Sequence, residues 1–212
     1  MNRKILSVLC IFTLILAVTM PSQAATGYQG YAIYRDGVLG PVNWHGGLMD
    51  KPSKDDIYPV IHIGGPDYQV EYVWWHEFTD GTEDYPYSKN SFMGYYRPVS
   101  QNPTSAQRDA VVATARQLAS NFIDYCGTEQ MHYDETSSTT KTYVQPSDID
   151  TIRCDGVVEY CYEYNNIRIY GSDMYWNIAR WGALYEAHHA SPTAITPRKQ
   201  AQDYMYVISY NP

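Results

Sequence analysis

Hydrophobic and polar residues alternate through the first half of the chain with the short period that is typical of β-strands. The apolar and aromatic segments are separated by residues that favour turns, among them Asp36-Gly37 and Gly64-Gly65-Pro66. Segments of this kind at hairpin-like intervals predict antiparallel strands. The expected strands cover residues 31–34, 42–49, 58–63, 70–75 and 94–99.

The period lengthens after residue 100. Thr104 and Gln107 have the spacing of a capping box, in which each residue satisfies a free backbone N–H of the other. Apolar residues then recur at helical spacing, at Val111, Ala115, Leu118 and Phe122. This pattern predicts an amphipathic helix over residues 104–122.

The rest of the chain is predicted to contain one long loop and three further helices. Residues 128–150 are polar and rich in Ser and Thr, which indicates a long loop. Further helices are expected over 154–161, 176–189 and 198–209. Strands followed by helices, with no internal repeat and no linker, predict a single α+β domain in which an antiparallel sheet packs against helices.

The first 24 residues have the composition of a secretory signal peptide. Arg3 and Lys4 are basic, Ile5 to Met20 are almost wholly apolar, and Ser22 and Ala24 are small residues at −3 and −1 of a cleavage site. The apolar run is too short and wrongly flanked for a membrane span. We therefore expect a signal peptide over 1–24, a mature domain over 25–212, and secretion to the extracellular space or the cell wall.

The net charge and the cysteine content of the mature chain limit its binding partners and its disulfide bonds. Removal of residues 1–24 leaves 13 basic and 23 acidic residues, a formal net charge of −10. An acidic protein is a poor candidate for binding nucleic acid or anionic membranes. The mature chain keeps Cys126, Cys154 and Cys161, an odd number, so at least one thiol is not in an internal disulfide. If that thiol is Cys154, Cys126–Cys161 is the internal disulfide that remains, unless both are reduced.

Cys154 is the leading candidate for a nucleophile. Positions 154, 157, 158 and 161 are apolar or thiol and share one helix face, and nothing before Cys154 continues the pattern. A thiol at a helix N-terminus meets partial positive charge and free N–H groups, which favour the reactive thiolate. Asp155 would oppose this effect unless its side chain points to solvent, as we expect. The alternative is a small buried residue at a helix start.

His45 and His62 fall in strands that are expected in the same sheet, where their side chains could meet. Nucleophilic catalysis by cysteine requires an imidazole that takes the proton and a third polar group that orients the ring. Cys154, His45 and His62 fit these roles, with Asp67 and Glu71 as alternatives to His62. Metal catalysis is not expected, because His188 and His189 are adjacent on a predicted helix and no metal-binding motif occurs.

The order of these motifs resembles that of a known family. Trp44-His45-Gly46-Gly47, Val60-Ile61-His62-Ile63 and Tyr95-Tyr96-Arg97-Pro98 are followed by a helix with Arg108 and then by Arg153-Cys154-Asp155-Gly156. The chain resembles the circularly permuted branch of the papain-like NlpC-type hydrolases, which includes bacterial amidase-like proteins and lecithin:retinol acyltransferase-like enzymes. In that branch the histidine strand precedes the cysteine helix. The resemblance runs from about Gly30 to Tyr164.

The resemblance implies a permuted papain-like fold and a cysteine hydrolase without cofactor. It makes Cys154 the nucleophile, His45 the base and His62 the third residue, with the Cys154 N–H in an oxyanion hole. The implied substrate is a peptide, an amide or a lipid ester, with peptidoglycan as one candidate. Gly46-Gly47 and Asp155-Gly156 depart from the pattern of the family. Transfer of the acyl group to another acceptor, and an inert binding or structural protein on the same scaffold, remain as alternatives.

Overall fold

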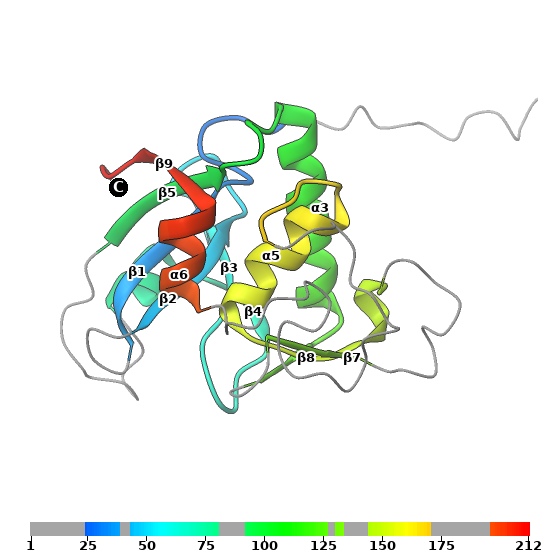
Figure 1. The fold of residues 1–212 in the computed structure, drawn as a ribbon. Coiled ribbons are helices and arrows are strands. Elements are labelled where there is room, and N and C mark those ends of the chain that lie inside the picture. Colours follow the sequence, from blue (N-terminus) through cyan, green and yellow to red (C-terminus); the bar gives the residue numbers. More distant parts are fainter. Residues whose placement is uncertain (1–23, 39–42, 81–91, 127–129, 134–143, 171–195) are drawn as a thin grey trace, which may run out of the picture.

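The computed structural model describes residues 24–38, 43–80, 92–126, 130–133, 144–170 and 196–212 (Figure 1). Its largest element is a six-stranded antiparallel sheet with strand order β4-β3-β2-β1-β5-β9. The strands are β1 (Ala32–Val38), β2 (Asn43–Met49), β3 (Val60–Ile63), β4 (Val70–Val73), β5 (Phe92–Pro98) and β9 (Met205–Ser209). The sheet packs against helices, so the prediction of an α+β fold with an antiparallel sheet is confirmed.

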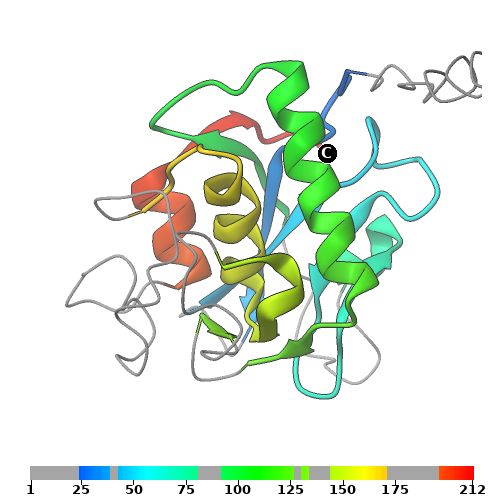
Figure 2. The same ribbon diagram turned by 90° about the vertical axis from the view of Figure 1, so that its right-hand side faces the viewer.

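Two long helices lie side by side on one face of this sheet (Figures 1 and 2). They are α3 (Ser105–Ser120) and α5 (Cys154–Tyr164). The Thr104 side chain accepts a hydrogen bond from the Gln107 N–H, and the Gln107 side chain accepts one from the Thr104 N–H, so the predicted capping box is present. The helix α5 begins at Cys154, as the sequence pattern predicted.

The core occupies both faces of the sheet because side chains alternate along each strand. Tyr34, Leu48 and Ile61 are buried with residues of α3 and α5 on one face. On the other face a smaller cluster is buried: Ile33, Met49, Val60, Val73, Phe78 and Tyr95. Phe78 belongs to α2 (Trp75–Asp80), where the sequence predicted a strand to residue 75. The chain turns from strand to helix there because the Glu77 side chain accepts the Trp74 N–H at 2.7 Å.

A second, three-stranded sheet lies beside the start of α5. Its strands are β6 (Asp124–Tyr125), β7 (Met131–Tyr133) and β8 (Ile149–Ile152), in the order β6-β8-β7. A short 3₁₀ turn, η2 (Pro146–Asp148), precedes β8. The prediction of a continuous loop over 128–150 is therefore wrong for β7, η2 and the start of β8. This sheet determines where Cys154 lies, because β8 leads into α5 through Arg153 alone.

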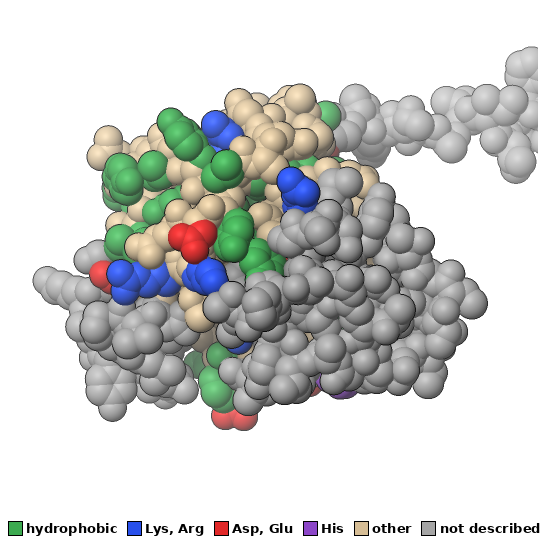
Figure 3. Space-filling view, viewed as in Figure 1, with side chains coloured by type: hydrophobic (Ala, Val, Ile, Leu, Met, Phe, Trp, Pro, Cys, Tyr) green, Lys and Arg blue, Asp and Glu red, His purple; other side chains and the backbone are tan. Residues whose placement is uncertain are grey.

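The C-terminal segment also differs from the prediction. A helix was expected over 198–209, but only α6 (Pro197–Lys199) and a π turn, η5 (Gln200–Tyr204), are helical before β9 begins. The sequence of β9 alternates, with Met205 buried while Tyr206 and Ile208 are exposed, and β9 pairs with β5. Figure 3 shows hydrophobic side chains at the surface around β9 and the C-terminus. The helix predicted over 176–189 lies outside the described residues.

The start of the described chain is tied to α3 by Arg108. Its guanidinium donates hydrogen bonds to the carbonyl oxygens of Ala25, Gly27 and Gln29, at 3.1, 2.9 and 2.6 Å. Gly30 has a φ of +78° and its Cα lies so close to α3 that a Cβ would be 2.6 Å from that of Arg108. The predicted signal peptide falls almost wholly outside the described residues. No helix among those described is both long enough and apolar enough to cross a bilayer.

Candidate active site

Cys154 occupies the first turn of α5, in a backbone arrangement that the local sequence explains. Arg153 is extended, with φ −98° and ψ 164°, and its N–H donates to the Gln130 carbonyl oxygen at 2.9 Å. The same carbonyl lies so close to Gly156 that any Cβ at this position would overlap it. The Asp155-Gly156 pair, which departs from the family pattern, thus has a structural reason: only glycine lets the small sheet approach the helix start.

The Cys154 thiol is buried, with 6% of the residue exposed. Burial, and to a smaller extent the Asp155 carboxylate, raise its pKa to about 11. Hydrogen bonds from the backbone N–H groups of Gly46 and Asp155, together with the Arg153 charge, act in the opposite direction. The sulfur therefore lies against the backbone of β2 and is protonated at neutral pH. This differs from the expectation that the helix N-terminus would favour a resting thiolate, because desolvation is the larger effect.

Asp155 does not point to solvent, and that expectation is wrong. Its side chain is fully buried and is held by Arg153 through two hydrogen bonds, Nε to Oδ1 at 2.6 Å and Nη2 to Oδ2 at 2.8 Å. A bidentate pair of this kind fixes both side chains in one geometry. The first turn of α5 therefore carries a buried ion pair directly beside the thiol.

The structure brings His45 and His62 into contact. His45 Nε2 lies 2.7 Å from His62 Nδ1, and the rings are nearly perpendicular, at 88°. Burial and the Arg35 charge lower the pKa of both rings, to about 3 for His62, and His62 lowers that of His45 as well. Both rings are therefore neutral at neutral pH. Glu71 faces His62 across β3 and β4, but the residue in contact with the His45 ring is His62.

The thiol and the histidine pair approach β2 from opposite sides. A Cβ on Gly46 would point toward α5, 3.5 Å from the Val158 side chain, whereas one on Gly47 would meet Phe78 at 3.1 Å. His45 shares the Gly47 side, and its ring lies 5.6 Å from that of Phe78. Gly46-Gly47 thus lets α5 and Phe78 both approach the strand closely. The sulfur reaches this strand at the N–H of the residue that follows His45.

Arg35 is a site residue that the sequence analysis missed. It is 8% exposed, lies opposite His45 in the β1–β2 register, and its guanidinium carbon is 5.8 Å from the centre of the Phe78 ring. Burial lowers its pKa to about 10, while Cys154 raises it. The alternation with Ile33 could have identified it, but the turn signal at Asp36-Gly37 ended the predicted strand at Tyr34. With both rings neutral, Arg35 supplies positive charge at the site.

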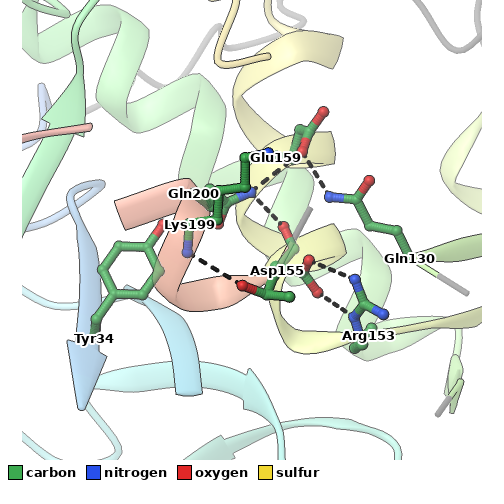
Figure 4. A network of polar contacts seen from close by, with 8 residues as sticks. Tyr34, Gln130, Arg153, Asp155, Glu159, Lys199 and Gln200 are labelled. Carbon is green, nitrogen blue, oxygen red and sulfur yellow. Dashed lines mark hydrogen bonds and ion pairs between the residues drawn. The ribbon is translucent and has the colours of Figure 1, made fainter. Parts of the chain in front are cut away.

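A buried polar network holds the start of α5 (Figure 4). Gln200 Nε2 donates to the Asp155 carbonyl at 2.9 Å and to Glu159 Oε2 at 3.3 Å. Tyr34 donates to Gln200 Oε1 at 2.7 Å, and Gln130 donates to Glu159 Oε2 at 2.6 Å. The network joins β1, the C-terminal segment and the loop before β7 to α5. Such networks favour one arrangement of the elements that they connect.

The remaining candidates do not add to this site. Cys126, Cys154 and Cys161 are all free thiols, so the disulfide considered between Cys126 and Cys161 is not formed. Over the part of the chain that the structure describes, no group of three or more His, Cys, Asp and Glu side chains is arranged to hold a metal ion. His188 and His189 lie outside that part.

Comparisons with known proteins add no relative from which roles could be transferred. No protein-family model matches the chain, and no curated protein or solved structure matches it significantly. The resemblance to the permuted papain-like hydrolases therefore stays a prediction, and the site is interpreted from its own geometry.

Proposed function

We propose that the protein is a secreted cysteine hydrolase that cleaves an amide or ester bond, with Cys154 as nucleophile, His45 as base and His62 as the residue that orients His45. One observation carries the proposal. The Cys154 sulfur, at a helix N-terminus, accepts the Gly46 N–H of β2, and on the other side of the same strand Nε2 of His45 is in contact with His62. A nucleophile, a base and an orienting group in this order are the parts that covalent catalysis requires.

In the first step the sulfur attacks the carbonyl carbon and the thiol proton passes to His45. Because the thiol and the His45 ring approach β2 from opposite sides, the proposal requires the ring to turn toward the sulfur, or a water to carry the proton between them. The contact with His62 occupies Nε2 of His45, so Nδ1 is the nitrogen that takes the proton. The carbonyl oxygen becomes an oxyanion, which the Cys154 N–H at the free helix end can stabilise. His45 then returns the proton to the leaving amine or alcohol. Water, activated by the same ring, adds to the acyl group and releases the acid and the thiol.

The electrostatics of the site keep both the thiol and the imidazole neutral before attack. Burial raises the pKa of Cys154 to about 11, and burial together with Arg35 lowers the pKa of His45. A preformed thiolate and imidazolium pair is therefore disfavoured in the resting protein. His45 serves as a general base, an effect that contributes roughly 10²- to 10⁴-fold in rate.

The chemical class of the substrate follows from the resemblance. Peptides, amides and lipid esters are the candidates, and a secreted enzyme would encounter peptidoglycan peptides. The test is hydrolysis by purified residues 25–212 of a panel of aryl esters, aminoacyl amides and peptidoglycan fragments, followed by mass spectrometry of the products. Adding an amine or alcohol acceptor distinguishes acyl transfer from hydrolysis.

The matched control lies on the same helix. Cys154→Ser should lower the rate at least about 10³-fold, because a serine hydroxyl is a poor nucleophile beside a base that is built for a thiol. Cys161→Ser changes an equally buried thiol seven positions later and should leave the rate within about threefold if the variant folds. Equal losses in both variants would contradict the proposal.

A second function, an inert binding or structural protein on this scaffold, is favoured by one observation. The Cys154 thiol is almost inaccessible and its pKa is raised, as for a structural cysteine. Iodoacetamide distinguishes the two functions. A nucleophile that the His45 base can reach should be alkylated faster than Cys161, whereas an inert scaffold should protect both thiols equally.

A further inference from the structure

A groove of about 1340 Å³ runs along the β4 edge of the large sheet, between β4, the loop before β3 and the end of α3. We call it the edge groove. Aromatic side chains form much of its lining, and three of them are well exposed: Tyr58, Tyr72 and Phe122. Aromatic rings at this density, exposed around a concave surface, are typical of binding sites.

Carboxylates accompany the rings. Asp50 in the lining is neutralised by Lys51 at 2.8 Å and Arg116 at 2.6 Å, and Lys51 is the basic residue of the lining. The other carboxylates of the lining belong to Asp67, Glu71 and Asp124. The Asp124 carboxylate accepts a hydrogen bond from a neutral amide, Gln69 Nε2, at 2.9 Å. The edge groove therefore has an excess of negative charge beside its aromatic walls.

The backbone around the edge groove is strained. Tyr58, Asp67 and Phe122 have positive φ angles of 48°, 70° and 55°. For aromatic residues this conformation is unfavourable, by roughly 1–3 kcal/mol each, and is typical of ligand clamps and other functional positions. Two of the strained residues carry the exposed rings Tyr58 and Phe122. The strain thus holds rings at the rim, where a ligand would meet them.

The edge groove approaches the candidate active site at Tyr125, which lines it. Tyr125 pairs with Ile152 in the parallel register of β6 and β8, and Ile152 precedes Cys154 by two residues. A chain whose scissile bond lies at Cys154 could therefore continue past Tyr125 into the edge groove. This links the groove to the same substrate.

We infer that the edge groove binds a peptide segment that carries Lys or Arg side chains, as part of the substrate of the proposed hydrolase. Ammonium and guanidinium groups pair with carboxylates such as Asp67, Glu71 and Asp124, and they stack on aromatic faces such as those of Tyr58 and Phe122. A cation beside Glu71 would offset the repulsion from Glu77, which together with burial raises the pKa of the Glu71 carboxyl. That this peptide segment belongs to the substrate rests on the proposed function. Binding of the segment in the edge groove is independent of that function.

The test uses the Cys154→Ser protein, which cannot consume the probe. The probes are two acetylated and amidated peptides, Gly-Lys-Gly-Lys-Gly and Gly-Glu-Gly-Glu-Gly, whose affinities are measured by calorimetry at low ionic strength. The lysine peptide should bind at least about tenfold more tightly, and 0.5 M salt should remove most of the difference. Equal affinities for the two peptides would overturn the inference.

Two triple variants of equal net charge separate the edge groove from the general acidity of the protein. Asp67→Asn/Glu71→Gln/Asp124→Asn removes the carboxylates of the groove and should weaken lysine-peptide binding at least about tenfold. Asp55→Asn/Asp150→Asn/Asp203→Asn removes three exposed carboxylates outside the lining and should change it less than twofold. Equal effects would overturn the inference. Binding that passes both tests without any hydrolysis by the unmodified protein would reject the proposed function alone.

Discussion

Two buried thiols seven residues apart on α5 differ in what surrounds them. Cys161 is fully buried, and burial alone raises its pKa well above the ordinary value. Cys154 is almost as buried, but two backbone N–H groups and Arg153 counteract the burial, and its pKa rises only to about 11. The surroundings of Cys161 thus stabilise only the neutral thiol, whereas the surroundings of Cys154 already contain hydrogen-bond donors for the thiolate. Under the proposed function, the difference in reactivity between the two thiols lies in these donors, because both thiols are desolvated.

The histidine pair should give the largest difference between the two thiols. His45→Ala should lower hydrolysis roughly 10²- to 10⁴-fold and slow alkylation of Cys154, because the base that takes its proton is gone. Alkylation of Cys161 should not change. Rates are measured by mass spectrometry of each cysteine peptide, with His132→Ala as control, since His132 is half-exposed and pairs with Asp150. If Cys154 and Cys161 respond alike to His45→Ala, the base does not act on Cys154.

Much of this site could be predicted from sequence, and the reasons are local. The start of α5 at Cys154 and the capping box at Thr104 follow from patterns within a single turn. The contact between His45 and His62 follows from two strands close in sequence. Such features depend on few residues, so periodicity and turn signals identify them.

The missed features depend on distant partners. Asp155 is buried because Arg153 pairs with it and because Gln200, 45 residues later, binds its carbonyl. The C-terminal strand β9 forms because β5 offers an edge to Met205–Ser209, although the residues before it favour a helix. Arg35 enters the site because β1 continues past the turn signal at Asp36-Gly37. No local pattern reports these contacts, because tertiary pairing overrides propensity.

The next effect concerns Gly156, which shapes the turn that contains Cys154 but not the turn that contains Cys161. Gly156→Ala would place a Cβ against the Gln130 carbonyl oxygen and the Ile152 side chain. The free energy of unfolding should fall by about 2 kcal/mol or more, although alanine favours helices. Urea unfolding measures this. Gly65→Ala, where a Cβ meets nothing within 4 Å, is the matched control and should change stability by less than about 0.5 kcal/mol.

The buried histidines His45 and His62 should also make stability depend on pH. Their pKa values are lowered in the folded chain, so below pH 6.5 the unfolded chain takes up protons that the folded chain does not. Their contribution is therefore complete above pH 6.5 and is lost as the pH falls, by about 1.4 kcal/mol per pH unit for each ring. Urea unfolding between pH 7.5 and 5.5 measures the slope. His62→Gln should reduce it, and an unchanged slope would mean that the ring is not desolvated.

The smallest effect tests the ion pair beside the thiol. The Asp155 carboxylate raises the pKa of Cys154 and the Arg153 guanidinium lowers it, so removing either charge should shift the pH profile of alkylation in opposite directions. Asp155→Asn should move the profile of Cys154 to lower pH, and Arg153→Gln should move it to higher pH, each by up to about one unit.

Loss of either partner also leaves the other one buried and weakens the fold, so the direction of the shift is the decisive measurement and its size is not. Cys161, about two helical turns further along α5, provides the internal reference, and its profile should stay in place in both variants. A shift of Cys154 in the same direction in both variants would show that loosening of α5, and not charge, sets the reactivity of the thiol. In that case the comparison between the two thiols would reduce to a difference in burial, and the inert scaffold would become the better interpretation of the site.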